Sequence, residues 1–138
     1  VRSSTIRLSK RKTGVYRMDQ NALEKLGIDF ENGIGRFAGS EALYGKYLLR
    51  FLEDGHYRAG VCAMHRNEYA AMFDAMHALK SVSGTLGMTE LFDCCAAVTT
   101  AIRAGKTGGI EELMAQAGEV HDRLYAGLSA LRAAGGLE

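Results

Sequence analysis

The chain has 138 residues, 47% of them hydrophobic, and a formal net charge of +1. This length suits one domain with its own hydrophobic core. No apolar run approaches the roughly 20 residues of a membrane span, and no secretory signal is visible. The three cysteines lack the spacing of a metal site or a disulfide framework. We therefore expect a cytoplasmic location, where thiols stay reduced, and no metal site.

Charge is unevenly distributed along the chain. Residues 1–18 contain six Lys or Arg residues and no acidic residue, whereas the remainder contains 11 basic and 16 acidic residues. A basic arm can bind nucleic acid or an anionic lipid surface. This one lacks interleaved aromatic residues and a recognition helix. We interpret residues 1–18 as a flexible arm or linker and expect no nucleic acid or membrane contact, with DNA binding by the arm as a weaker alternative.

The remaining residues, 19–136, read as a succession of helices. Asp19 and Ser40 are good N-caps, and glycines end most of the helical patterns. No segment alternates as a strand would. The expected helices cover residues 19–26, 32–38, 40–53, 56–66, 69–87, 89–105 and 109–134. Four of them are long and their connections are short, which favours an all-α, antiparallel four-helix bundle with short additional N-terminal helices. Tyr44, Tyr47 and Phe51 are expected in its core.

The segment 69–87 is the most informative of these helices. Its apolar side chains recur at spacings of three and four residues and form one stripe. His77 lies about 130° from the centre of that stripe, taking about 100° per residue, so it should point to solvent or to the rim of the core. Its neighbours on that side are Ala70, Phe73, Asp74, Lys80, Ser81 and Gly84. Several are small, so another protein could approach the backbone closely.

Two of these neighbours allow more than one interpretation. Phe73 lies off the apolar stripe, and it could contact a partner or cover the core against a short N-terminal helix. Gly84 in mid-helix costs about 1 kcal/mol relative to Ala. This cost indicates that bare backbone is needed there, either for a partner or for a closely packed helix.

The string His77-Ala78-Leu79-Lys80-Ser81, followed by Gly84 and Gly87, resembles the His-x-Leu-Lys-Gly motif of histidine-containing phosphotransfer (HPt) domains. The resemblance runs from about Gly27 to Leu131 and includes the lead-in Arg36–Tyr44 and the helix that follows it. One position departs from the motif, because Ser81 stands where the family has glycine. Serine is still small, so we expect docking to survive.

The resemblance implies that His77 accepts and donates a phosphoryl group, and neutral imidazole is a good nucleophile toward phosphorus. Lys80 would pair with the phosphoryl oxygens. Ala70, Phe73, Asp74, Ser81 and Gly84 would meet the partner. In this family a receiver domain of a response regulator, or a hybrid sensor histidine kinase, is the partner, and the receiver brings the aspartate and Mg²⁺. The chain itself would bind no cofactor, would lack an autonomous catalytic site and would act as a monomer.

Three alternatives to this interpretation stay open. His77 could be a surface histidine with no role. The bundle could dock a receiver or a kinase without being phosphorylated, in which case binding would not depend on His77. It could also be the phospho-accepting domain of a chemotaxis-type histidine kinase, labelled by a kinase domain with ATP.

Overall fold

The computed structural model describes residues 18–137, so the interpretation of residues 1–17 as an arm lies outside the described residues. Every regular element in the described part is an α-helix, in agreement with the all-α prediction. The helices are α1 (Gln20–Lys25), α2 (Phe30–Gly35), α3 (Glu41–Phe51), α4 (His56–His65), α5 (Tyr69–Leu86), α6 (Thr89–Arg103) and α7 (Ile110–Ala133).

The N-caps explain where the first helices begin. Asp19 accepts a hydrogen bond from the Ala22 amide, and Ser40 accepts one from the Leu43 amide, both at 3.1 Å, which confirms these two caps. The short helix expected over residues 32–38 begins two residues earlier, at Phe30. The reason is Asp29, whose carboxylate accepts from the Asn32 amide and caps the helix there.

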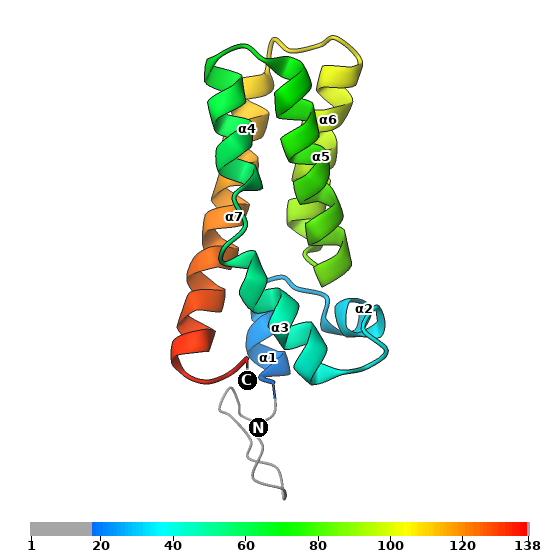
Figure 1. The fold of residues 1–138 in the computed structure, drawn as a ribbon, viewed down its shortest axis with the longest axis vertical. Helices are drawn as coiled ribbons and strands as arrows, with labels where there is room; N and C mark the ends of the chain where they lie inside the picture. Colours follow the sequence, from blue (N-terminus) through cyan, green and yellow to red (C-terminus); the bar gives the residue numbers. More distant parts are fainter. Residues whose placement is uncertain (1–17, 138) are drawn as a thin grey trace, which may run out of the picture.

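Four helices form an elongated antiparallel bundle (Figure 1). Helix α5 packs between α4 and α6, and α7 completes the bundle beside α6. The buried core contains methionine and leucine side chains from α5–α7, Ala63 of α4 and aromatic residues of α3. The predicted bundle is therefore confirmed.

One of the four sides of the bundle differs from the prediction. The sequence predicts that the single helix 40–53 forms this side, with a shorter helix after it. In the structure α3 and α4 follow one another along the bundle, α3 at its lower end and α4 beside the upper part of α5 (Figure 1). The short link 52–55 joins them, and Phe51 and Leu52 at its start are buried. Neither helix alone spans the length of α7.

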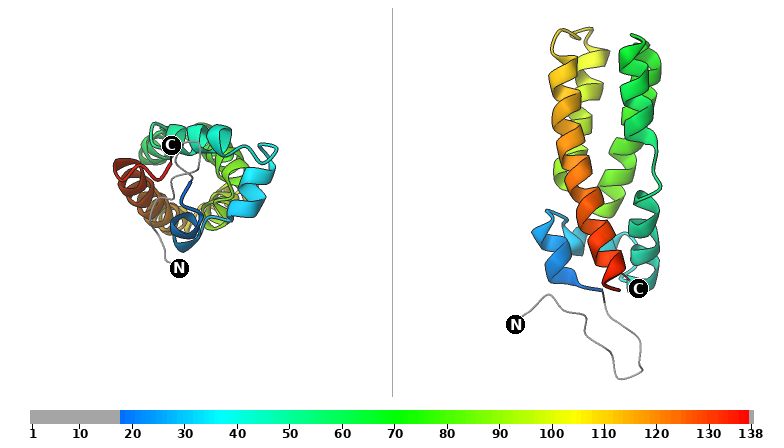
Figure 2. Two further views of the ribbon diagram at one scale, coloured as in Figure 1. Left: turned by 90° about the horizontal axis from the view of Figure 1, so that it is seen from below. Right: turned by 90° about the vertical axis from the view of Figure 1, so that its left-hand side faces the viewer.

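Helices α1 and α2 lie at the lower end of the bundle, as the right-hand view of Figure 2 also shows. The Asp29 amide donates to the Gly87 carbonyl at 2.8 Å, and Ile28 and Met88 form an isolated antiparallel bridge. Gly87 has a left-handed φ of +79°, and a Cβ there would lie 2.4 Å from the Asp29 carbonyl oxygen. Only glycine fits this turn, so the end of α5 is held in place.

The domain extends slightly beyond the predicted limits of 19 and 136. Met18 and Leu137 are both buried and belong to the core. The Asp19 amide donates to the Gly136 carbonyl at 3.1 Å, which joins the two ends of the domain. Met18 therefore belongs with the bundle and not with the arm.

The aromatic residues of α3 divide into buried and exposed. Tyr44 and Phe51 are fully buried, as predicted, whereas the prediction for Tyr47 is wrong, because it remains 37% exposed. Tyr47 stacks on Phe37 and carries the Arg50 guanidinium 4.9 Å from its ring centroid. Since α3 lies at the end of the bundle, no helix within residues 18–137 covers this face completely.

Candidate functional site

Helix α5 presents His77 at the middle of its length, away from the core. The stripe predicted for this helix is buried except at its first residue, Tyr69, which is half-buried. Met72, Met76 and Leu79 are fully inaccessible. Gly87 ends the helix in the left-handed conformation. His77 is exposed, as the helical phase predicts. The imidazole is thus held on a rigid helix within reach of another protein.

The His77 ring has an aromatic neighbour one turn earlier on the same helix. Phe73 stacks against it with ring centroids 5.6 Å apart and planes inclined by 7°. The Arg103 guanidinium, at the end of α6, lies 5.1 Å from the Phe73 ring centroid. Phe73 therefore orients the imidazole and lies against α6. The alternative that it covers the core against a short N-terminal helix is wrong, because α1 and α2 lie at the other end of α5 (Figure 1).

Lys80 lies one turn after His77 and is half-buried. Its ammonium nitrogen is 5.4 Å from the centroid of the Phe92 ring, which α6 supplies. A cation over an aromatic face at this distance is attracted by the ring quadrupole. Phe92 thus supports the lysine side chain near His77 while leaving its charge available.

Two residues at this site were missed by the sequence analysis. Phe92 and Arg103 both lie on α6, far from the His-x-Leu-Lys string. Each takes part in a contact between a cation and an aromatic ring. The Phe92 ring contacts Lys80, and the Arg103 guanidinium contacts the Phe73 ring. The sequence could have indicated these residues only through their position on the face of α6 that packs against α5. To identify that face, one must know how the two helices align.

The predicted docking residues are not equally accessible. Ala70, Asp74 and Ser81 are exposed, whereas Phe73 and Gly84 are half-buried. A Cβ added to Gly84 would lie 3.0 Å from Cδ2 of Phe92. Close packing of α6 therefore accounts for a glycine at this position.

The remaining histidines lie in different surroundings. His56 contacts the Asp54 carboxylate at 2.9 Å, and His65 is exposed in the last turn of α4. The His121 side chain is 13% exposed and stacks on Tyr57. Within residues 18–137 no three His, Cys, Asp or Glu side chains gather as a metal site needs. The same residues contain no helix long and apolar enough to span a membrane.

Two cysteines on α6 are poor rivals to His77 as nucleophiles. Burial raises the pKa of the Cys95 thiol to about 12. Burial also raises the pKa of the Cys94 thiol, and the nearby Glu90 carboxylate adds to the effect. Since the thiolate is the reactive form, neither cysteine is activated near neutral pH.

The chain was compared with known proteins. A family model described as "Hpt domain" matches residues 46–134, which span the second half of α3 and all of α4, α5, α6 and α7. No curated protein matches the chain significantly, and no solved structure does.

Proposed function

The chain belongs to the Hpt domain family, whose model covers well over half of it, and we propose that it carries a phosphoryl group on His77 between receiver-domain aspartates in a two-component phosphorelay. The observation that supports this most directly is an exposed histidine at mid-helix with a lysine one turn later. The family match identifies the helical domain, and the surroundings of His77 suit this chemistry.

The proposed reaction is a displacement at phosphorus. A ring nitrogen of neutral His77 attacks the phosphoryl group of an aspartyl phosphate on the partner. The N–P bond forms as the P–O bond to the aspartate breaks, and the carboxylate leaves with the bonding electrons. The other ring nitrogen keeps its proton. The product phosphoramidate stays reactive, so the reverse steps can pass the group to a second aspartate.

The residues around His77 have separate tasks in this proposal. Phe73 holds the imidazole in one plane. The ring therefore loses less orientational freedom when it reacts, which lowers the entropic cost of the step. Lys80 supplies a positive charge where the phosphoryl oxygens arrive. Arg103, whose guanidinium lies against the Phe73 ring, adds a second positive charge to this part of the surface. The receiver domain supplies the aspartate and Mg²⁺, so catalysis comes from the partner.

The test is phosphoryl transfer from a panel of phosphorylated receiver domains, with Mg²⁺, read as intact mass at neutral to mildly alkaline pH. We expect one phosphoryl group on the wild type and none on His77→Gln. The matched control is His65→Gln, since His65 is another exposed helical histidine and its loss should leave labelling intact. Circular dichroism checks that both variants keep their helices.

Two outcomes would overturn the proposal in different ways. Receiver binding without labelling, equally strong in His77→Gln, would indicate a docking module. Labelling of His77 by a histidine kinase with ATP, and by no receiver, would indicate the phospho-accepting domain of a chemotaxis-type kinase.

A further inference from the structure

The surface beside His77 divides into two flanks along α5. Taking about 100° per residue, Ser81 and Thr85 follow His77 on the side that faces α3, whereas Phe73, Lys80 and Gly84 lie on the side that faces α6. We call these the α3 flank and the α6 flank. The docking residues predicted from the sequence are divided between the two, so the sequence leaves open from which flank a partner approaches.

The α6 flank is already filled by the chain's own side chains. The Phe92 ring covers Gly84 and supports Lys80, while the Phe73 ring contacts both His77 and Arg103. A recess on this flank, toward the lower end of the bundle, has a volume of only about 170 Å³. Its lining is mixed and consists of Asn32, Arg36, Ser83, Gly84, Gly87, Met88, Thr89 and Phe92. An apolar side chain from a partner has little place to bind there.

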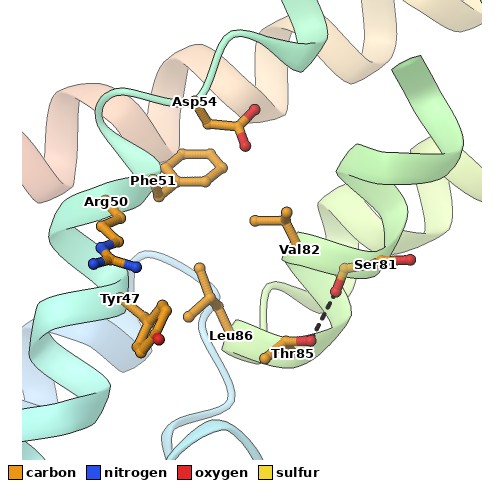
Figure 3. A pocket seen from close by; sticks show the side chains of 8 residues that line it. All are labelled: Tyr47, Arg50, Phe51, Asp54, Ser81, Val82, Thr85 and Leu86. Carbon is orange, nitrogen blue, oxygen red and sulfur yellow. Dashed lines mark hydrogen bonds between the residues drawn. The ribbon is translucent and has the colours of Figure 1, made fainter. Parts of the chain in front are cut away.

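The α3 flank instead contains an open groove of about 340 Å³, shown in Figure 3. Its apolar surface comes from both helices, and its rim is polar. The apolar lining consists of Phe51, Val82 and Leu86 with the ring of Tyr47. The rim consists of Arg50, Asp54, Ser81 and Thr85. Figure 3 shows α3 and α5 facing one another across this space.

The groove continues directly from the phospho-accepting position. Ser81 lies one helical turn after His77 and also lines the groove, and residues four apart are neighbours on a helix surface. A protein that brings an aspartate to His77 therefore comes next to this groove. Tyr47 and Leu43, 37% and 42% exposed, extend the apolar surface along α3.

We propose that the receiver domain docks on the α3 flank and inserts an apolar side chain into this groove. This inference rests on the proposed function. The α3 flank then determines which receiver binds, while the α6 flank holds the imidazole and the phosphoryl group. An apolar pocket with a polar rim is the usual form of an anchoring contact at a protein interface.

The test compares two threonine-to-arginine variants. Thr85 is an exposed residue at the rim of the groove, and Thr100 is an exposed residue on α6. Arginine favours helix more than threonine does, so both variants should fold.

With a receiver that labels the wild type, we expect Thr85→Arg to raise KM about tenfold, because a bulky charge at the groove opposes burial of the receiver's apolar side chain. Thr100→Arg should leave KM within about twofold of the wild type.

A second readout separates docking from chemistry. Phosphoramidate, a small donor that needs no docking surface, should label His77 at the same rate in the wild type and both variants. Equal KM in Thr85→Arg and the wild type, or a raised KM in Thr100→Arg alone, would overturn the docking inference and leave the proposed function standing. If no receiver labels the wild type, the proposed function fails and the docking inference fails with it.

Discussion

The two flanks of α5 differ in what already covers them. On the α6 flank each aromatic ring is paired with a cation, and the glycine backbone lies under Phe92. On the α3 flank the helices separate and leave apolar side chains around an open groove. One helix can thus present a charged site, already packed by the chain's own side chains, on one side of its histidine and an uncovered apolar surface on the other. The first suits a small anion and the second suits a protein partner.

The largest expected difference between the flanks concerns Lys80. In Lys80→Ala the maximal rate of phosphoryl transfer at saturating receiver should fall about 10- to 100-fold, because hydrogen bonds to charged groups contribute about 1.5–3 kcal/mol. KM should stay within about twofold, since the α6 flank does not dock the partner in our proposal. Rapid-quench kinetics over a range of receiver concentrations would separate the two constants.

The control for this variant is Lys80→Arg, which keeps the charge and should retain part of the rate. Unfolding in urea should show a loss of no more than about 1 kcal/mol for Lys80→Ala, the usual size of a partly exposed cation–π contact. A raised KM at an unchanged maximal rate would place Lys80 in the docking surface and erase the distinction between the flanks.

Alkaline pH should lower the stability of the fold through two buried groups, one on α3 and one on α6. Burial raises the pKa of Tyr44, whose hydroxyl donates to the Leu86 carbonyl at 2.7 Å and joins α3 to the end of α5. Burial also raises the pKa of Cys95 on α6 from 9.0 to about 12. Both groups stay protonated in the folded state at pH values where the unfolded chain ionises them. Their contribution to stability is therefore complete below about pH 9 and declines as pH rises above it.

Urea unfolding between about pH 8 and 11 would measure this decline, which should approach about 1.4 kcal/mol per pH unit for each group. Cys95→Ala should reduce the part of the decline that begins near pH 9.0, to which Cys94 also contributes. Tyr44→Phe should reduce the part that begins near pH 10.0, to which Tyr57 also contributes. If the stability of the wild type stays constant over this range, the raised pKa values of Cys95 and Tyr44 do not affect it, and this prediction is wrong.

The smallest expected effect is that of Gly84→Ala. Alanine in mid-helix gains about 1 kcal/mol over glycine, but its Cβ would press on the Phe92 ring at 3.0 Å. Since Phe92 is only half-buried and its ring can shift, we expect a net stabilisation below about 0.5 kcal/mol. The KM for the receiver should not change. A clear rise in KM at unchanged stability would return Gly84, and the α6 flank, to the docking surface.

Much of the candidate site was predictable because it depends on relations within one helix. The phase of the apolar stripe places His77 on the outer surface of α5, and Lys80 follows one turn later whatever the rest of the fold does. The caps at Asp19 and Ser40 are equally local, since each spans three residues. The family resemblance rests on this helix together with the lead-in Arg36–Tyr44, and the family match confirms it.

The parts that were not predictable depend on which helices meet and at what height. Periodicity does not show that Arg103 reaches the level of Phe73, or that Phe92 reaches Gly84, because the alignment of α5 and α6 is set by the turn at Gly87 and by side-chain packing. Tyr47 fits an apolar stripe, yet it is partly exposed, because α3 lies at the end of the bundle.

By itself, then, the sequence determined an all-α bundle and an exposed histidine with its lysine, because helical phase and capping are local properties. Only the tertiary structure decided how the flanks of that helix differ. The tandem arrangement of α3 and α4 opens the groove on one flank, and the alignment of α6 fills the other. Both result from contacts between side chains distant in the chain, whose geometry depends on how the whole core packs.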